Sequence, residues 1–162
     1  MASLASLLEA YLAGVKELES AVQGMNREQL LARPVPGKWS TLEVVCHLAD
    51  FEPIFADRLK RVLADDRPTL LSADENRFAA CLAYHERDLA EELALVAHTR
   101  GQMARILRVQ PEAVLARVGV HSVAGPRTLE QLLGGAIRHI PHHVSFIHDK
   151  RRALGLSVPT TP

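Results

Sequence analysis

Four of the chain's eight histidines fall within residues 139–148, and two of them, His139 and His143, are four residues apart. Side chains at this spacing share one face of a helix, so the pair could present two imidazoles to one metal ion. The pair alone is weak evidence, because eight histidines placed at random in 162 positions give about 0.4 such pairs. A metal site therefore needs a further ligand from another part of the chain.

His47, in the segment CHLAD, is that further candidate. On a helix it shares an apolar face with Val44, Phe51 and Ile54, so its imidazole is expected to point into the core. His139 and His143 also lie on the apolar side of their segment, with Leu132, Ala136 and Ile147. Three buried imidazoles leave several polar nitrogens to satisfy, and coordination of one ion would satisfy one nitrogen of each. Three protein ligands also leave a coordination position open, as in catalytic zinc sites.

The other five histidines give no comparable pattern. His142 and His148 fall on the polar side of the same segment. His85, His98 and His121 have no histidine or cysteine four residues away, although His121 lies in a loop that could overhang the site. A single core histidine is more often a hydrogen-bonded packing residue than a ligand, so the metal hypothesis depends on His47, His139 and His143 acting together.

Two carboxylates, Glu43 and Asp50, lie one turn to either side of His47. Either could accept a hydrogen bond from the second nitrogen of an imidazole, or move a proton during catalysis. Both could equally be ordinary surface carboxylates beside a helix start, and the residues do not separate these alternatives. Cys46 points about 100° away from His47 on a helix, so we interpret it as a packed small side chain rather than a nucleophile.

Helical periodicity dominates the elements that must position these residues. Residues 3–23 form one apolar stripe, and a short helical turn starts at Asn26. Capping-box patterns at Ser40, Ser72 and Thr128 predict three further helices, over about 40–64, 72–107 and 128–154. Pro53 predicts a kink at residues 49–53.

Residues 108–127 look irregular, with a short helix at PEAVLARVG, and strand-like alternation is nearly absent from the chain. Pro141 could kink the last helix or begin a new one. We prefer a continuous helix, because the apolar period runs through the proline without a shift. The prediction is an all-α fold, an antiparallel four-helix bundle with short extra helices in its loops, covering residues 1–157, followed by a frayed tail at 158–162.

Composition and charge exclude some classes of partner and indicate the cellular compartment. Nineteen basic and nineteen acidic residues give no net charge, and no apolar run is long enough to span a membrane, so neither nucleic acid nor a membrane is an expected partner. The 48% hydrophobic content can fill a core without a structural metal. Cys46 and Cys81 lie in apolar surroundings without a CxxC motif, which favours two buried free thiols in a cytoplasmic protein over a disulfide.

The sequence as a whole resembles a known family. The segments GKWSTLEVVCHLADFE, ADRLKRVL, ADENRF and LLGGAIRHIPHHVSFIHDKRRALG, taken in order, resemble the DinB-like superfamily, which includes YfiT-like proteins assigned as metal-dependent hydrolases. The resemblance implies a four-helix bundle with a long crossing connection. It also implies a divalent metal, nickel or zinc, bound by His47, His139 and His143. The family pattern often has a polar residue near Phe146, so a polar contact from that position is in doubt here.

The resemblance specifies the metal-binding residues but leaves two reactions open. It implies either hydrolysis by metal-activated water or transfer to an electrophile by a low-molecular-weight thiol, in both cases on a small-molecule substrate. The alternative is a non-enzymatic stress-related binding module, or a dimerising protein, with a vestigial metal site. A homodimer is compatible with both readings.

Overall fold

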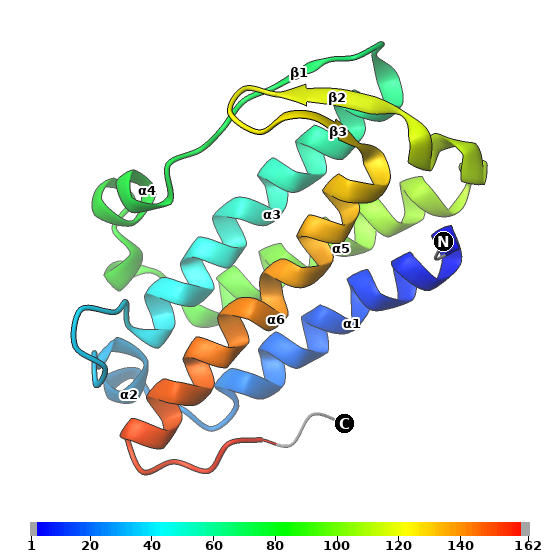
Figure 1. Cartoon of the computed structure of the whole chain (residues 1–162). Helices are drawn as coiled ribbons and strands as arrows, with labels where there is room; N and C mark the ends of the chain where they lie inside the picture. Colours follow the sequence, from blue (N-terminus) through cyan, green and yellow to red (C-terminus); the bar gives the residue numbers. More distant parts are fainter. Residues whose placement is uncertain (1–2, 160–162) are drawn as a thin grey trace.

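The computed structural model describes residues 3–159, and residues 160–162 of the predicted tail lie outside that range. Four long helices form a bundle: α1 (Leu4–Val22), α3 (Thr41–Ala64), α5 (Leu89–Arg108) and α6 (Leu129–Ala153). Helices α1 and α3 each pack against both α5 and α6, so they occupy opposite corners of the bundle (Figure 1). The predicted four-helix bundle is confirmed.

The helix directions differ from a simple antiparallel arrangement. Figure 1 shows α1 and α6 running one way and α3 and α5 the other, so the neighbouring pairs α1–α6 and α3–α5 are parallel. Parallel neighbours require a connection that returns along the length of the bundle. The segment between α3 and α5 does this: it descends one side of the molecule through β1 (Thr69–Leu70), α4 (Glu75–Cys81) and the 3₁₀ turn η1 (Tyr84–Glu86).

Local capping sets several helix starts where the sequence predicts them. Ser40 and Glu43 form a reciprocal capping box at the start of α3, and Thr128 and Gln131 form another at α6. The short helix α2 (Arg27–Leu31) is capped in the same way by Asn26. Helix α6 runs through Pro141 without a break, as we preferred, and Gly155 follows it with a positive φ of 71°.

The prediction of a single helix over residues 72–107 is wrong. The helix is interrupted between α4 and α5. Ala83 adopts the left-handed conformation (φ 49°). A right-handed helix cannot continue through a residue in this conformation. Asp88 then caps α5 by accepting hydrogen bonds from the backbone N–H groups of Ala90 and Glu91. The predicted Ser72 cap is also wrong, since Asp74 caps α4.

A small sheet replaces part of the segment predicted as irregular. It follows the predicted short helix, here the 3₁₀ helix η2 (Glu112–Ala116), and contains β2 (Val118–His121) and β3 (Gly125–Thr128). Strand β2 pairs antiparallel with β3 and parallel with β1, whose Thr69 lies opposite Val120. Gly119 allows this sheet to lie close against the bundle, because a Cβ there would lie 2.8 Å from side-chain atoms of both Leu70 and Val62.

The cysteines differ in environment. Both are free, and Cys46 is fully buried as expected, but Cys81 is exposed near the end of α4, so that part of the prediction is wrong. Within residues 3–159 no helix is long and apolar enough to cross a membrane.

Candidate metal centre

Three histidines from two adjacent helices converge in the bundle. His47 comes from α3, and His139 and His143 come from α6. Their potential ligand nitrogens all lie within 4.8 Å of one another, and the Nε2 atoms of His47 and His139 are 3.0 Å apart. Two nitrogens bound to one tetrahedral ion at 2.0–2.1 Å would lie roughly 3.3 Å apart. The sequence hypothesis thus selected the three residues that the fold brings together.

The helix surfaces explain this convergence. His47 is fully buried on the inner face of α3, and His143 is 9% exposed on α6. Because α6 continues through Pro141, His139 and His143 stay one turn apart on the same face, toward α3. A helix restarted at Pro141 would have separated them.

Aromatic rings surround the histidines. The rings of Trp39 and Phe51 lie 5.3 and 4.4 Å from His47, and Phe55 lies 5.2 Å from His139, measured between ring centroids. Phe146, where the family pattern often has a polar residue, places its ring 5.6 Å from His143 and offers no polar side-chain group. These rings limit the access of water to the imidazoles and lower the local polarity.

Burial keeps the three imidazoles neutral. It lowers the pKa of His47 to about 4, although the Asp50 carboxylate opposes this effect. Burial, together with the neighbouring histidines, lowers the pKa of His139 to about 2 and that of His143 to about 3. A metal ion binds only the deprotonated nitrogen of an imidazole, so at neutral pH all three rings are in the form that a metal requires.

The hydrogen bonds around the rings test whether the residues fit a metal. The Nδ1 atoms of all three histidines are buried without a hydrogen-bond partner. The Nε2 atoms of His47 and His139 face each other at 3.0 Å, where either one N–H···N hydrogen bond or one ion can join the two rings. No group of the described chain therefore holds the three rings through Nδ1, and the converging ring nitrogens fit an ion that takes one nitrogen from each ring.

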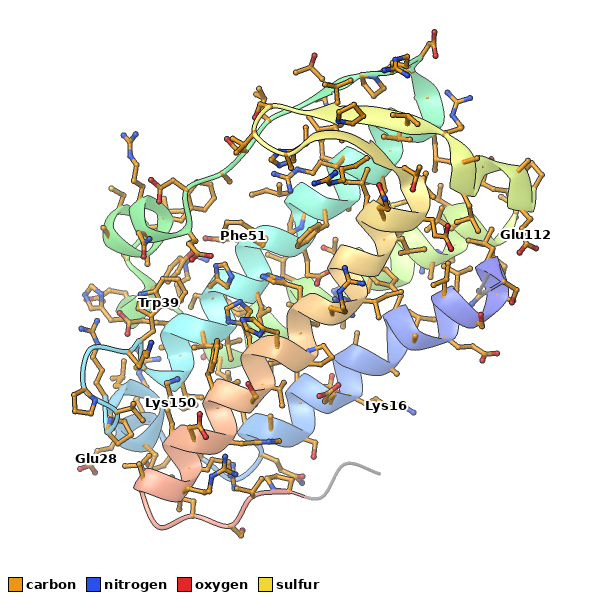
Figure 2. All side chains as sticks on the ribbon, in the orientation of Figure 1. Lys16, Glu28, Trp39, Phe51, Glu112 and Lys150 are labelled. Carbon is orange, nitrogen blue, oxygen red and sulfur yellow. The ribbon has the colours of Figure 1, made fainter. Side chains whose placement is uncertain are left out.

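A cavity of about 350 Å³ opens beside the cluster, with His143 in its wall. Trp39 and Phe146 contribute apolar surface to it, and Lys38 and Lys150 contribute positive charge. Figure 2 shows Trp39 and Lys150 on the side of the bundle where the connection leading into α3 passes close to α6. The sequence analysis missed Lys150, although its position seven residues after His143 places it on the same helical face.

The two candidate carboxylates are engaged elsewhere. Glu43 is buried, accepts a hydrogen bond from the backbone N–H of Ser40 at 2.7 Å and forms an ion pair with Arg33. Asp50 forms an ion pair with Arg87 at 2.8 Å. Neither accepts a hydrogen bond from an imidazole of the cluster within the described chain, and a proton-transfer role for either stays a prediction.

The other histidines lie apart from the cluster. His85, His98 and His142 are exposed, His148 is half-buried, and His121 lies on β2, where its Nδ1 accepts hydrogen bonds from backbone N–H groups of the following turn. None of them belongs to the three-histidine group.

A second buried polar cluster lies nearby, and the sequence analysis missed it. Arg100 and Glu52 form an ion pair at 2.5 Å in which both side chains are fully buried. Arg100 also donates to the backbone carbonyls of Tyr11 and Ala136, and the Tyr11 hydroxyl donates to Glu52 at 3.3 Å. Tyr11, Glu52 and Arg100, here called the Arg100 cluster, join all four long helices.

Comparison with known proteins agrees with this geometry. A model of the DinB superfamily matches residues 10–147. The Bacillus subtilis protein named "Putative metal-dependent hydrolase YfiT" is 29% identical over 142 residues, which are 87% of this chain and 80% of that protein. "Putative metal-dependent hydrolase GK0616" of Geobacillus kaustophilus is 30% identical over 144 residues, 86% of this chain and 79% of that protein.

A solved structure extends the similarity to three dimensions. The structure of Bacillus subtilis YfiT, described as a probable metal-dependent hydrolase with an unusual four-helix bundle topology, superposes with a TM-score of 0.88 at 26% identity. The match covers 95% of this chain and 89% of the other. Sequence and structure together show that this chain belongs to the DinB superfamily.

Proposed function

We propose that the three-histidine cluster binds one divalent metal ion and that the protein is a metal-dependent enzyme acting on a small molecule. The observation that carries the proposal is the convergence of three neutral imidazoles, whose potential ligand nitrogens lie within 4.8 Å of one another and one of which, His143, lines a cavity. The names of the relatives as metal-dependent hydrolases support the same assignment.

His47, His139 and His143 would hold the ion through one nitrogen each. A divalent ion bound by three protein ligands supplies a Lewis acid with an open coordination position, suited to activating water or a small thiol as a nucleophile. The chain's own residues would do the rest: Trp39 and Phe146 exclude water from the cavity and pack against the apolar part of a substrate. The volume of about 350 Å³ suits a small molecule and not a macromolecule.

Nickel and zinc are the proposed metals, since neutral imidazoles suit both ions. Hydrolysis and thiol-dependent group transfer are the two proposed reactions, because both need an open coordination position beside a cavity that can hold a small molecule. A serine or cysteine nucleophile is not part of the proposal: burial raises the pKa of Cys46 to about 12, and its thiol contacts the backbone carbonyl of Tyr84.

Elemental analysis of untagged protein tests the metal site directly. We expect about one nickel or zinc ion per chain, and none in a variant with His47, His139 and His143 all replaced by alanine. The loaded protein would then be assayed for hydrolysis, and for transfer with and without small thiols. Failure of the metal-stripped protein to bind any offered divalent ion would overturn the proposal and favour a binding module without metal chemistry.

A further inference from the structure

Lys150 is a buried lysine without a counter-ion. It is 2% exposed, and among residues 3–159 its ammonium forms no ion pair with a carboxylate. Its Nζ donates a hydrogen bond to the backbone carbonyl of Phe146, one turn earlier on α6, at 3.1 Å. An ammonium group has three donors, so this contact leaves donors free.

The acidic groups near Lys150 already have partners. Asp149 forms an ion pair with Arg152 at 2.6 Å, and Glu43 forms one with Arg33. Glu75 lines the same cavity but is exposed, where water screens its charge. Burial lowers the pKa of Lys150, consistent with a charge that the surrounding protein does not fully compensate.

The Lys150 side chain bends back along α6 and lines the same cavity as His143. Its hydrogen bond to the Phe146 carbonyl shows that it bends toward the start of α6, where His143 lies on the same face. Both residues line the cavity of about 350 Å³, together with Lys38 at its exposed side. The cavity thus has a set of potential metal ligands at one place and an uncompensated buried cation at another.

We propose that Lys150 binds an anionic group, such as a carboxylate, of a small substrate whose reactive end meets the three-histidine site. The inference rests on the proposed function for its second half, since the reactive end is placed by the metal. The anion-binding part of the proposal does not depend on a metal. Burying an unpaired ammonium costs free energy, and a bound anion would compensate its charge. Phe146 and Trp39 would pack against the apolar part between the two ends.

Trp39, the only tryptophan of the chain, lines the cavity and provides a test that needs no metal. We would quench its fluorescence in metal-free protein with iodide, an anion, and with acrylamide, a neutral quencher, at constant ionic strength. Lys150→Met keeps the length and fills the same buried space without charge. Lys16→Met, on the exposed face of α1 away from the cavity, is the matched control (Figure 2).

The expected result is a loss of at least about half of the iodide quenching in K150M, with acrylamide quenching unchanged and K16M equal to wild type. Equal iodide quenching in wild type and K150M would overturn the anion site. A parallel fall in acrylamide quenching would also overturn it, because the change would then be one of access to the ring rather than of charge.

A second measurement places the anion relative to the metal. Cobalt-loaded protein would be titrated with 3-mercaptopropionate, which carries a carboxylate, and with neutral 2-mercaptoethanol, by the absorption of the cobalt–thiolate bond. We expect K150M to weaken binding of the acid about tenfold and to leave binding of the neutral thiol unchanged. Equal effects on both thiols would refute the proposed role of Lys150. If neither cobalt nor any other offered divalent ion binds, the proposed function fails, and the iodide experiment still decides the anion site.

Discussion

The three-histidine cluster lies between α3 and α6, and the Arg100 cluster lies among all four long helices, yet the two differ in how far the protein satisfies their polar atoms. In the Arg100 cluster, the guanidinium reaches one carboxylate and two backbone carbonyls, and its charge is paired with that of Glu52. Among the described residues, Nε of Arg100 is the one buried side-chain nitrogen of that cluster without a partner, whereas in the histidine cluster the Nδ1 atoms of all three rings lack one. Both lie within one or two helical turns of each other, since Glu52 follows His47 by five residues and Ala136 precedes His139 by three.

The difference supports the proposed ligand role of the histidine cluster and a structural role for the Arg100 cluster. None of Tyr11, Glu52 and Arg100 lines the cavity of about 350 Å³ that His143 lines. A buried polar group that the protein itself satisfies can hold helices in register, and one that it leaves unsatisfied needs an external partner. Burial alone would not have distinguished the two clusters.

The largest expected effect comes from breaking the Arg100 cluster. Arg100→Met leaves the buried Glu52 carboxylate without its counter-ion, with the Tyr11 hydroxyl still donating to it, so the free energy of unfolding should fall by about 3–5 kcal/mol. Urea unfolding measures the loss. Metal content of the folded protein should not change.

A double variant provides the control for that experiment. Arg100→Met combined with Glu52→Leu removes both charges, and an apolar pair should recover much of the lost stability. If the single variant costs less than about 1 kcal/mol, the cluster does not hold the helices as argued.

The histidine cluster should respond to metal and not to the Arg100 change. A divalent ion at a hundred times its dissociation constant should stabilise wild-type protein by about 2.7 kcal/mol. His47→Ala should remove this gain while the protein stays folded, and His142→Ala should retain it, because His142 is exposed and outside the group. Thermal unfolding with and without chelator measures both, and a large loss of metal in His142→Ala would contradict the ligand assignment.

Much of this architecture follows from local sequence. The capping boxes at Ser40 and Thr128 and the apolar period through Pro141 identified two helices and the inward faces of His47, His139 and His143. Such signals act over three or four residues, so they are readable without knowing the fold.

Long-range contacts account for what the sequence did not reveal. Strand β1 pairs with β2 about fifty residues later, and Arg100 meets Glu52 only when α3 and α5 pack. Arg100 on its own looks like any arginine on a helix. The break before α5 had a signal, Asp88 followed by Glu91, but apolar periodicity across the break concealed it. Lys150 was missed because it stands beside Arg151 and Arg152 in the last turn of α6, where a charged side chain is usually exposed.

Gly14 offers a smaller test of how tightly the Arg100 cluster is packed. A Cβ at Gly14 would lie 2.6 Å from Nη1 of Arg100, which donates to the Tyr11 carbonyl, so alanine must displace the guanidinium. We expect Gly14→Ala to cost about 1–2 kcal/mol despite its better helix propensity. Gly135→Ala, on α6 with open space at its Cβ position, should instead stabilise by up to about 1 kcal/mol. Equal effects at the two glycines in urea unfolding would contradict the close packing of Arg100.

Glu43 gives the smallest and most discriminating test, because it lies one turn from His47 but bonds away from it. Burial alone would raise its pKa, but hydrogen bonds from Arg33 and Ser40 outweigh burial and lower the pKa below the ordinary 4.5. The ionised carboxylate therefore stabilises the fold fully above about pH 4.5, and this contribution is lost as the pH falls through the lowered value. Glu43→Gln should cost about 1 kcal/mol at pH 7, and the gap to wild type in urea unfolding should narrow toward pH 3. If Glu43 is only a helix cap, metal content at pH 7 stays at the wild-type level. A loss of metal in this variant would instead show that the Glu43 carboxylate supports metal binding by the histidine cluster and is not only a helix cap.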